Sequence, residues 1–207
     1  FYTRHAECAR NPAIRAAHIR KDQLDKFAKD FTIIYNKAWA GHGGLKQLEE
    51  KVVRKMFQSM KPVMDERISW FVYHKDEPIA LWINLPDLNQ WFKHLHGKFG
   101  LLNKLKFLWI KKTKKCDKFV GLVFGIVPEW QGKGVDSYMI VEGAKIIQKL
   151  KIENGEYTLG NNPIYSDYEM QWIGEFNPKM INVAEGLGTY RSRILTTYRY
   201  LFDRTKE

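Results

Sequence analysis

The fold of this chain is decided by the run Phe119-Val-Gly-Leu-Val-Phe-Gly-Ile-Val127 and by the turn Pro128-Glu-Trp-Gln-Gly-Lys-Gly134 that follows it. The apolar run is short and lacks strict alternation, which predicts a buried β-strand. Proline has no N–H to donate to a sheet, so we expect the strand to end at Pro128. Gly132 and Gly134 permit the positive φ angles of a tight turn, and the residues from Val135 onward predict a helix.

A strand, a glycine turn and a helix in this order can bind an anion with main-chain groups. The first N–H groups of a helix have no acceptor within it, and the helix dipole adds positive charge there. Two better-known phosphate loops do not fit, because one needs Ser or Thr where Gly134 stands and the other needs a third glycine where Ser137 stands. The turn alone is equally compatible with a strand and an amphipathic helix that bind no ligand.

The turn resembles the acetyl-CoA loop of the GCN5-related N-acetyltransferase superfamily, Gln/Arg-x-x-Gly-x-Gly/Ala after the fourth strand. Gln131 and Gly134 match that pattern, whereas Asp136 replaces the usual Gly or Ala. A carboxylate at this position repels a pyrophosphate group.

The end of the chain carries the second resemblance. An aromatic strand is expected over Tyr168 to Phe176, followed by Asn177 as the N-cap of a short helix and by a closing strand over Arg193 to Phe202. Acetyltransferases of this superfamily end in the same order. Many of them carry a tyrosine on that helix that protonates the CoA thiolate, and Ala184 occupies that position here.

The first half of the chain agrees with the same topology. Its patterns predict a strand over Ala13 to Ile19 and a hairpin over Ile68 to Ile83. Between them, helices are predicted over Gln23 to Ala38 and Leu48 to Met60. The resemblance implies a mixed α/β fold in which a mostly antiparallel sheet splays between its fourth and fifth strands. One bacterial branch of the superfamily, which the chain resembles, often carries such a domain as the C-terminal half of a longer protein.

Length and composition bound the remaining possibilities. We expect residues 1–12 to be an extension or linker and residues 13–207 to be a single domain with a basic aromatic insertion at about 85–118. The longest apolar run is far below the ~20 residues of a membrane span. Cys8 and Cys116 predict free thiols, and we expect a cytoplasmic protein.

The net charge of +11 is concentrated in the insertion, where lysines alternate with aromatic and leucine residues. The simplest interpretation is a helical insertion with a solvated lysine face. A site for CoA phosphates or an acidic partner is the second interpretation, and a nucleic-acid or membrane surface is the third. No nucleic-acid motif supports binding to RNA or DNA.

The resemblance implies a set of site residues. Those expected to bind the acyl-CoA are Phe124, Gly125, Ile126, Gln131, Gly132, Lys133, Gly134, Val135, Asp136 and Asn177. A main-chain N–H near Ile126 would polarise the thioester carbonyl. The family's tyrosine role has no counterpart here, so the proton carriers are inferred from position in the chain alone: Glu129, Glu175 or a chain of waters would accept the amine proton, and Tyr198, Tyr165 or Tyr168 would protonate the thiolate. No metal is expected.

The functional expectation is therefore a transferase that moves an acetyl group from acetyl-CoA to the amine of a small or amino-acid-like molecule. The acceptor pocket would border the loop around His42. An inactive acyl-CoA-binding or structural domain is the alternative, and a basic nucleic-acid-binding module ranks below both. An N-terminal domain or a second copy of the chain is compatible with the resemblance as a partner.

Overall fold

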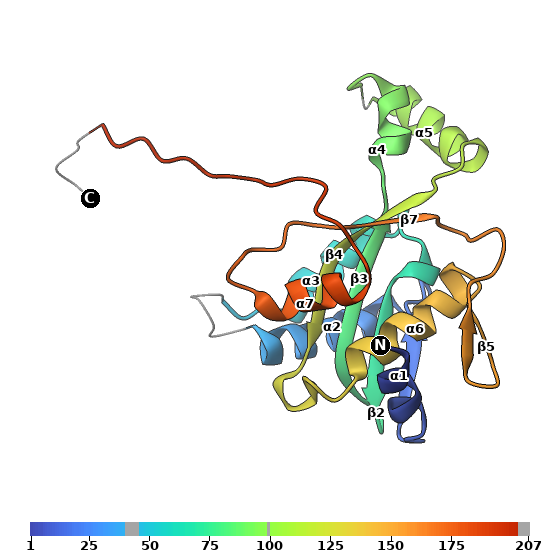
Figure 1. The fold of residues 1–207 in the computed structure, drawn as a ribbon. Helices are drawn as coiled ribbons and strands as arrows, with labels where there is room; N and C mark the ends of the chain where they lie inside the picture. Colours follow the sequence, from blue (N-terminus) through green and yellow to red (C-terminus); the bar gives the residue numbers. More distant parts are fainter. Residues whose placement is uncertain (40–45, 99, 203–207) are drawn as a thin grey trace. The chain divides into compact units, whose positions relative to one another are not determined.

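The computed structural model describes residues 1–39, 46–98 and 100–202. The chain divides into two compact units, one of Phe1–Trp172 and a smaller one that begins at Ile173. The first unit contains the sheet and all but one of the described helices (Figure 1).

The first unit is built on a five-stranded sheet in the order β1-β2-β3-β4-β7. Neighbouring strands are antiparallel except for β4 and β7, which are parallel. The strands are β1 (Ile14–His18), β2 (Trp70–His74), β3 (Glu77–Pro86), β4 (Lys118–Ile126) and β7 (Asp167–Met170). This mixed and mainly antiparallel sheet confirms the predicted fold class.

Helices cover both faces of the sheet, which is why β2 and β3 are apolar on both sides. Helices α2 (Leu24–Ala38) and α3 (Glu50–Met60) lie on one face, and α6 (Val135–Ile147) lies on the other (Figure 1). The core contains Phe27 and Phe31 of α2, Phe57 of α3 and Met139 of α6.

Helix α1 (Tyr2–Ala9) occupies most of the segment that the sequence predicted as an extension or linker, and it packs against α6. His5 on its inner side is buried, and its ring nitrogens lie 2.9 Å from a Glu142 carboxylate oxygen and 3.0 Å from the Tyr157 hydroxyl. Tyr157 belongs to a small hairpin of β5 (Lys151–Glu153) and β6 (Glu156–Thr158). These contacts connect the start of the chain to α6 and the hairpin.

The insertion forms a helical lobe between β3 and β4 (Figure 1). We call residues 87–117 the insertion lobe. It contains α4 (Asn89–Phe92), the short 3-10 helix η2 (Lys93–Leu95) and α5 (Leu101–Thr113). Trp91, Leu95, Phe107 and Ile110 are buried in it.

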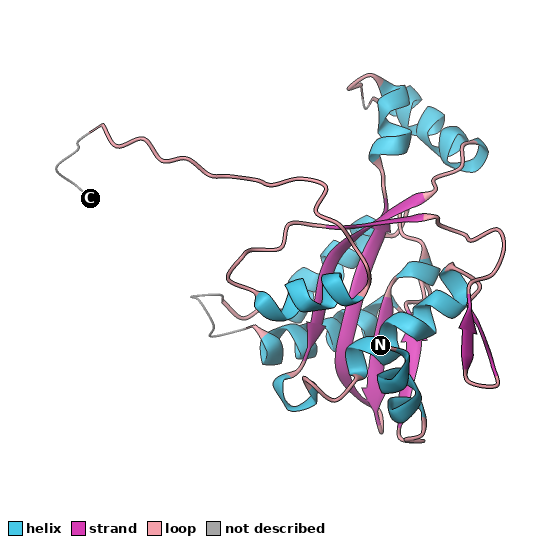
Figure 2. Cartoon of the chain, in the orientation of Figure 1, coloured by secondary structure: helices cyan, strands magenta, loops and turns pink. Residues whose placement is uncertain are grey.

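The second unit contains α7 (Pro178–Gly186), which Asn177 caps through its side-chain oxygen, 3.1 Å from the Met180 N–H. The prediction of a closing strand over Arg193 to Phe202 was wrong, because residues 189–202 form no helix or strand (Figure 2). The apolar residues there favour a strand, but a strand also needs a partner for its N–H and C=O groups. The predicted strand over Tyr168 to Phe176 is likewise limited to β7, which ends at Met170.

Within the described ranges, every helix is too short or too polar to cross a membrane.

Candidate functional site

Strand β4 loses its partner β7 halfway along its length. The two strands pair from Lys118 with Asp167 to Gly121 with Met170, and β4 then continues alone on that side to Ile126. The register with β3 shifts at the same place, leaving Leu122 as an extra residue. Such a bulge bends the bulged strand. Strand β4 is therefore unpaired on this side from Leu122 onward because β7 ends at Met170, and the facing strand expected near Trp172 to Glu175 is not formed.

The open edge of β4 presents main-chain N–H groups. The N–H of Val127 donates to the carbonyl of Ile79 at 2.9 Å, so Ala80 and Ile126 form a non-hydrogen-bonded pair. The N–H of Ile126 therefore points away from β3, toward the open edge, and the N–H of Phe124 points the same way because the direction alternates along a strand. Both groups are suitably directed to donate to a carbonyl oxygen.

A tight turn connects β4 to α6, beginning with the short 3-10 helix η3 (Pro128–Trp130). The N–H of Gln131, one of the predicted pyrophosphate donors, already donates to the carbonyl of Pro128 at 3.2 Å. The side-chain amide of Gln131 donates to the carbonyl of Ile126 at 3.1 Å. Gln131 thus stabilises the turn, and the N–H groups left for a ligand are those that follow it.

Gly132 and Gly134 both adopt the left-handed conformation, with φ of 76° and 79°. The first main-chain bond of α6 runs from the N–H of Tyr138 to the carbonyl of Gly134, at 2.9 Å. Val135, Asp136 and Ser137 therefore precede the helical ladder, and their N–H groups have no acceptor within the helix. A side chain at Gly132 would meet no atom within 4 Å, so this side of the turn is accessible to a ligand.

The charged groups around this turn are both favourable and unfavourable for an anion. Lys133 is exposed, and its Nζ lies 5.1 Å from the centre of the Trp130 ring. The main chain of Arg4 in α1 approaches Gly134 so closely that a Cβ added there would lie 3.1 Å from the Arg4 carbonyl oxygen. No pattern in the sequence connects Arg4 to a turn so far along the chain.

Asp136 is the unfavourable group. It lies close enough to Cys8 on α1 to influence that thiol: burial first, and the Asp136 carboxylate second, raise the pKa of Cys8 to about 11. The open space at Gly132, the N–H groups that have no acceptor within the helix, and the exposed Lys133 fit a diphosphate. The Asp136 carboxylate, the carbonyl of Arg4 and the burial of Val135 and Ser137 weaken that fit.

Trp39, at the C-terminal end of α2, covers Gly125 on β4. A side chain at Gly125 would overlap the Trp39 ring, so glycine is required for this contact. The Trp39 ring also packs against Tyr35, with ring centres 5.1 Å apart. Sequence analysis did not assign Trp39 to the site, although Phe31, Tyr35 and Trp39 repeat every four residues along one face of α2.

Tyr168 lies at the closed end of the gap between β4 and β7. Its hydroxyl accepts a hydrogen bond from Trp82 Nε1 at 3.0 Å, and burial raises the pKa of Tyr168 to about 12. Its hydroxyl packs on Gly121, five residues before Ile126, which is about 16 Å along a strand. Tyr168 therefore supports the sheet and does not reach a thioester held near Ile126.

Tyr165 is also engaged elsewhere. Its hydroxyl donates to Asp65 at 2.9 Å, and burial raises the pKa of Tyr165. Both residues line a pocket of about 300 Å³ between residues 63–67 and the insertion lobe, and its lining includes no residue of the turn after β4. Tyr165 is thus separated from the proposed chemistry.

The remaining predicted residues are differently placed. Glu129 lies in η3, exposed to solvent and three residues after Ile126. Glu175, Asn177 and Tyr198 belong to the second unit and are not placed relative to β4. His42 lies outside the described residues. Among the residues with described positions, no group of three or more His, Cys, Asp or Glu side chains is arranged to hold a metal ion.

Comparison with known proteins adds a sequence relative. No protein-family model matches the chain. A bacterial ceramide synthase from Caulobacter vibrioides is 26% identical over 178 residues, which cover 82% of this chain. The match spans only 43% of that relative's length.

Solved structures share the architecture. A possible acetyltransferase from Clostridium difficile 630 aligns over 92% of this chain and 99% of its own, with a TM-score of 0.52 and 14% identity. The chain has the GCN5-related N-acetyltransferase fold. An aminoglycoside acetyltransferase from an uncultured soil metagenomic sample, solved with sisomicin, covers 92% of this chain and 97% of its own at a TM-score of 0.54 and 8% identity.

A third neighbour with this fold has a bound ligand. It is an aminoglycoside N-acetyltransferase in complex with CoA, with a TM-score of 0.51 and 11% identity over 90% of this chain and 94% of its own. At these identities the likeness concerns the fold alone.

Proposed function

We propose that the chain is an acyl-CoA-dependent N-acyltransferase that acylates an amine by direct attack. The observation that carries this proposal is a helix N-terminus whose first N–H groups have no acceptor within the helix, preceded by two left-handed glycines and next to an unpaired strand edge. The N–H groups of residues 132–137 would hold the pyrophosphate, and those of Phe124 and Ile126 would face the acyl-bearing arm. The fold neighbour in complex with CoA supports this assignment.

The reaction needs little covalent chemistry from the protein. The amine nitrogen bonds to the thioester carbon, the C–S bond breaks, the amine loses one proton and the CoA sulfur gains one. The N–H of Ile126 stabilises the developing oxyanion, and positioning supplies much of the rate. Glu129 is exposed near the strand end, where it or a water molecule accepts the amine proton. Glu175 and Tyr198 remain proposals as proton acceptor and donor.

Two acceptor classes follow from different observations. The family resemblance of the loop favours acetyl-CoA with a small or amino-acid-like amine. The ceramide synthase relative favours a fatty acyl-CoA with a long-chain amino alcohol, since a ceramide carries a fatty acyl group on such an amine. A non-catalytic acyl-CoA-binding domain is the alternative to both, in keeping with Ala184 and Asp136.

Calorimetry with acetyl-CoA and palmitoyl-CoA tests the binding claim. Gly132→Asp places a carboxylate in the open side of the turn, and we expect it to weaken binding about tenfold or more. Gly155→Asp is the matched control, because Gly155 in the β5–β6 turn has a φ of 83° and equally open surroundings. No binding by the wild-type chain, or equal losses in both variants, contradicts the proposed site.

Thiol release with small amines and with a long-chain amino alcohol then separates the alternatives. Turnover identifies the acceptor class. Binding without turnover on either class favours the non-catalytic domain.

A further inference from the structure

Helix α5 in the insertion lobe exposes five large apolar side chains. Leu101, Leu102, Leu105, Leu108 and Trp109 are 78%, 80%, 60%, 54% and 63% exposed. We call these five residues the outer stripe. Contiguous apolar surface of this kind on a folded protein marks an interaction site.

The outer stripe is a second apolar face, separate from the one that holds the lobe together. At 100° per residue its five members lie within about 120° of the helix circumference. Phe107 and Ile110 lie outside this arc and are buried. The ring of Phe107 packs on Phe92 and Trp91, with centres 5.4 and 6.1 Å away. The lobe is thus folded without using its outer stripe.

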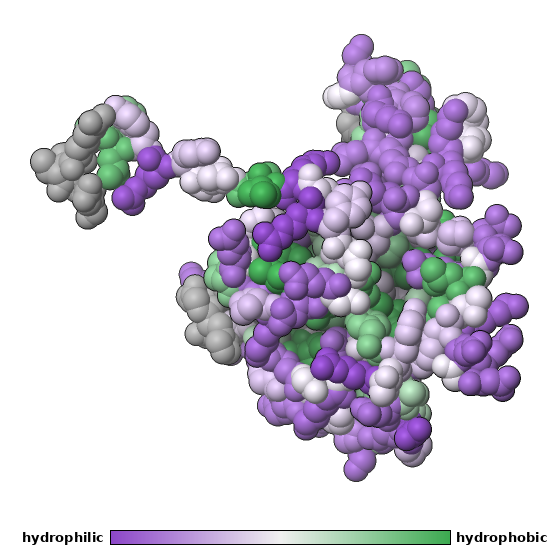
Figure 3. Space-filling model, in the orientation of Figure 1, coloured by the Kyte–Doolittle hydropathy of each residue, from purple (hydrophilic) through white to green (hydrophobic). Residues whose placement is uncertain are grey.

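The charge around the outer stripe is entirely positive. No Asp or Glu occurs between Leu88 and Cys116, and the lysines there are Lys93, Lys98, Lys104, Lys106, Lys111, Lys112, Lys114 and Lys115. Lys104 and Lys106 lie on either side of the stripe, each about 40° beyond its edge. The surface of the lobe that faces the viewer is predominantly hydrophilic (Figure 3).

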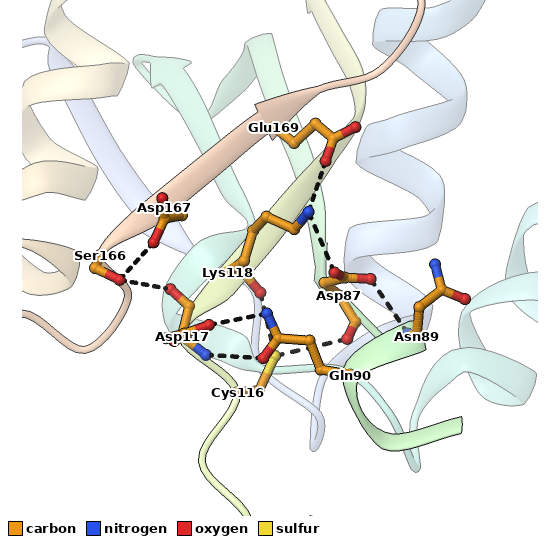
Figure 4. A network of polar contacts seen from close by, with 9 residues as sticks. All are labelled: Asp87, Asn89, Gln90, Cys116, Asp117, Lys118, Ser166, Asp167 and Glu169. Carbon is orange, nitrogen blue, oxygen red and sulfur yellow. Dashed lines mark hydrogen bonds and ion pairs between the residues drawn. The ribbon is translucent and has the colours of Figure 1, made fainter. Parts of the chain in front are cut away.

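Polar contacts join the base of the lobe to the sheet (Figure 4). Lys118 Nζ lies 2.7 Å from Glu169 of β7 and 3.4 Å from Asp87 at the end of β3. The side chain of Gln90 donates to Asp117 at 2.8 Å. Near the C-terminal end of α5, the side chain of Lys111 donates to the carbonyl of Pro62. These contacts fix the root of the lobe while the outer stripe remains exposed.

The positive charge of the lobe distinguishes between the partners that could cover the outer stripe. A second copy of the chain would place two sets of lysines against each other, which is repulsive. A nucleic acid satisfies the lysines, but four of the five stripe residues are leucines, which cannot stack on bases. An anionic lipid bilayer satisfies both features, since leucine and tryptophan enter the boundary between headgroups and acyl chains while lysines remain at the headgroups.

We propose that the insertion lobe docks the protein on the surface of an anionic phospholipid bilayer through the outer stripe of α5. The helix lies in the plane of the interface. Its lysines contact lipid phosphates, and the bilayer is not crossed. This inference depends on the lobe alone and holds whether or not the chain is an acyltransferase.

Vesicle flotation of the full chain tests the proposal. We expect binding to phosphatidylcholine vesicles that contain phosphatidylglycerol, and much weaker binding to phosphatidylcholine alone. The variant Lys104→Glu/Lys106→Glu should lower the partition coefficient at least about 30-fold, because each lysine near the membrane surface contributes about fivefold and the new carboxylates add repulsion. Lys29→Glu/Lys55→Glu is the matched control, because both lysines are exposed outside the lobe and the net charge changes equally.

The apolar part is tested separately. Leu101→Asn/Leu105→Asn/Leu108→Asn should lower the partition coefficient at least about tenfold. Val52→Asn/Met56→Asn removes exposed apolar side chains from α3 and should leave it unchanged. The substituted residues are exposed in all four variants, the two lobe variants and their two controls. Circular dichroism should therefore show that each variant is folded.

Several results would overturn the proposal. The first is no vesicle binding by the wild-type chain, and the second is equal losses in the lobe variants and their controls. A dimer that dissociates on substitution of the outer stripe would assign the stripe to a second copy. Binding of an oligonucleotide or of an acidic protein without binding of anionic vesicles would assign the lobe to those partners.

Discussion

At the scale of single residues, the candidate site depends on glycines that serve different purposes. Gly132 and Gly134 provide left-handed backbone, and their role could be predicted because only glycine adopts that conformation without strain. Gly125 provides space for Trp39, which sequence analysis did not foresee. A contact between the end of a helix and a strand some eighty residues later leaves no local pattern to read.

The Gly125–Trp39 contact gives a prediction for stability. Gly125→Ala should lower the free energy of unfolding by about 1–3 kcal/mol, because the new methyl group overlaps the Trp39 ring. In a Trp39→Ala background the same change should have little effect, which gives a coupling energy of about 1–3 kcal/mol. Urea denaturation of the four proteins measures the cycle. Additive effects would show that the ring does not cover Gly125.

At the scale of elements, long periodic segments were predictable and short ones were not. Helices α2 and α3 and the β2–β3 hairpin follow the predicted ranges closely, because each has a clear apolar spacing. Helix α1 was missed, since its eight residues include no large aliphatic side chain and its packing depends on His5 and Cys8. The closing strand was predicted wrongly because strand propensity says nothing about the presence of a neighbouring strand.

The packing of α1 on α6 should be sensitive to alkaline pH through Cys8. The pKa of Cys8 is raised from 9.0 to about 11, by burial and by Asp136. A raised folded-state pKa contributes stability that is complete below pH 9 and is lost as the pH rises toward 11. Urea denaturation should therefore show a loss that Cys8→Ala reduces, by at most about 1.4 kcal/mol per pH unit for one proton.

Below pH 8 the two pH profiles should run parallel, which provides the internal control for that measurement. An unchanged alkaline slope in Cys8→Ala would mean that the thiol ionises freely in the folded protein.

At the scale of the whole molecule, the order of the helices and strands was predicted well, but the tertiary contacts around the candidate site and the insertion lobe were not. The strand, turn and helix from Phe119 to Ile147 were identified from their residues, and the structure places them together as expected. The bulge at Leu122, the approach of Arg4 and the exposure of the outer stripe depend on tertiary packing. The sequence identified the insertion as basic and aromatic, but it could not show which side chains remain uncovered.

The attachment of the insertion lobe predicts that it can be removed. The N–H of Asp87 donates to the carbonyl of Lys118 at 2.9 Å, so the chain enters and leaves the lobe at adjacent positions. Replacing residues 88–117 with Asn-Gly should close a β3–β4 hairpin and leave a folded, cooperative protein. We expect acyl-CoA binding to be retained within about twofold, a change of only ~0.4 kcal/mol.

Binding to anionic vesicles should be lost in the same variant. Calorimetry and flotation on one preparation measure both properties. Loss of acyl-CoA binding with an intact circular dichroism spectrum would contradict the independence of the lobe and the site.

The unpaired edge of β4 has a consequence for how the proposed acyl-CoA would be recognised. Beyond Leu122 the strand offers a row of main-chain groups to which β7 adds no partner. The arm of CoA carries two amide groups, which can form hydrogen bonds with the unpaired N–H and C=O groups of β4 as an added strand would. The protein would then bind CoA through main-chain groups, and most side-chain substitutions along β4 would leave that binding unchanged.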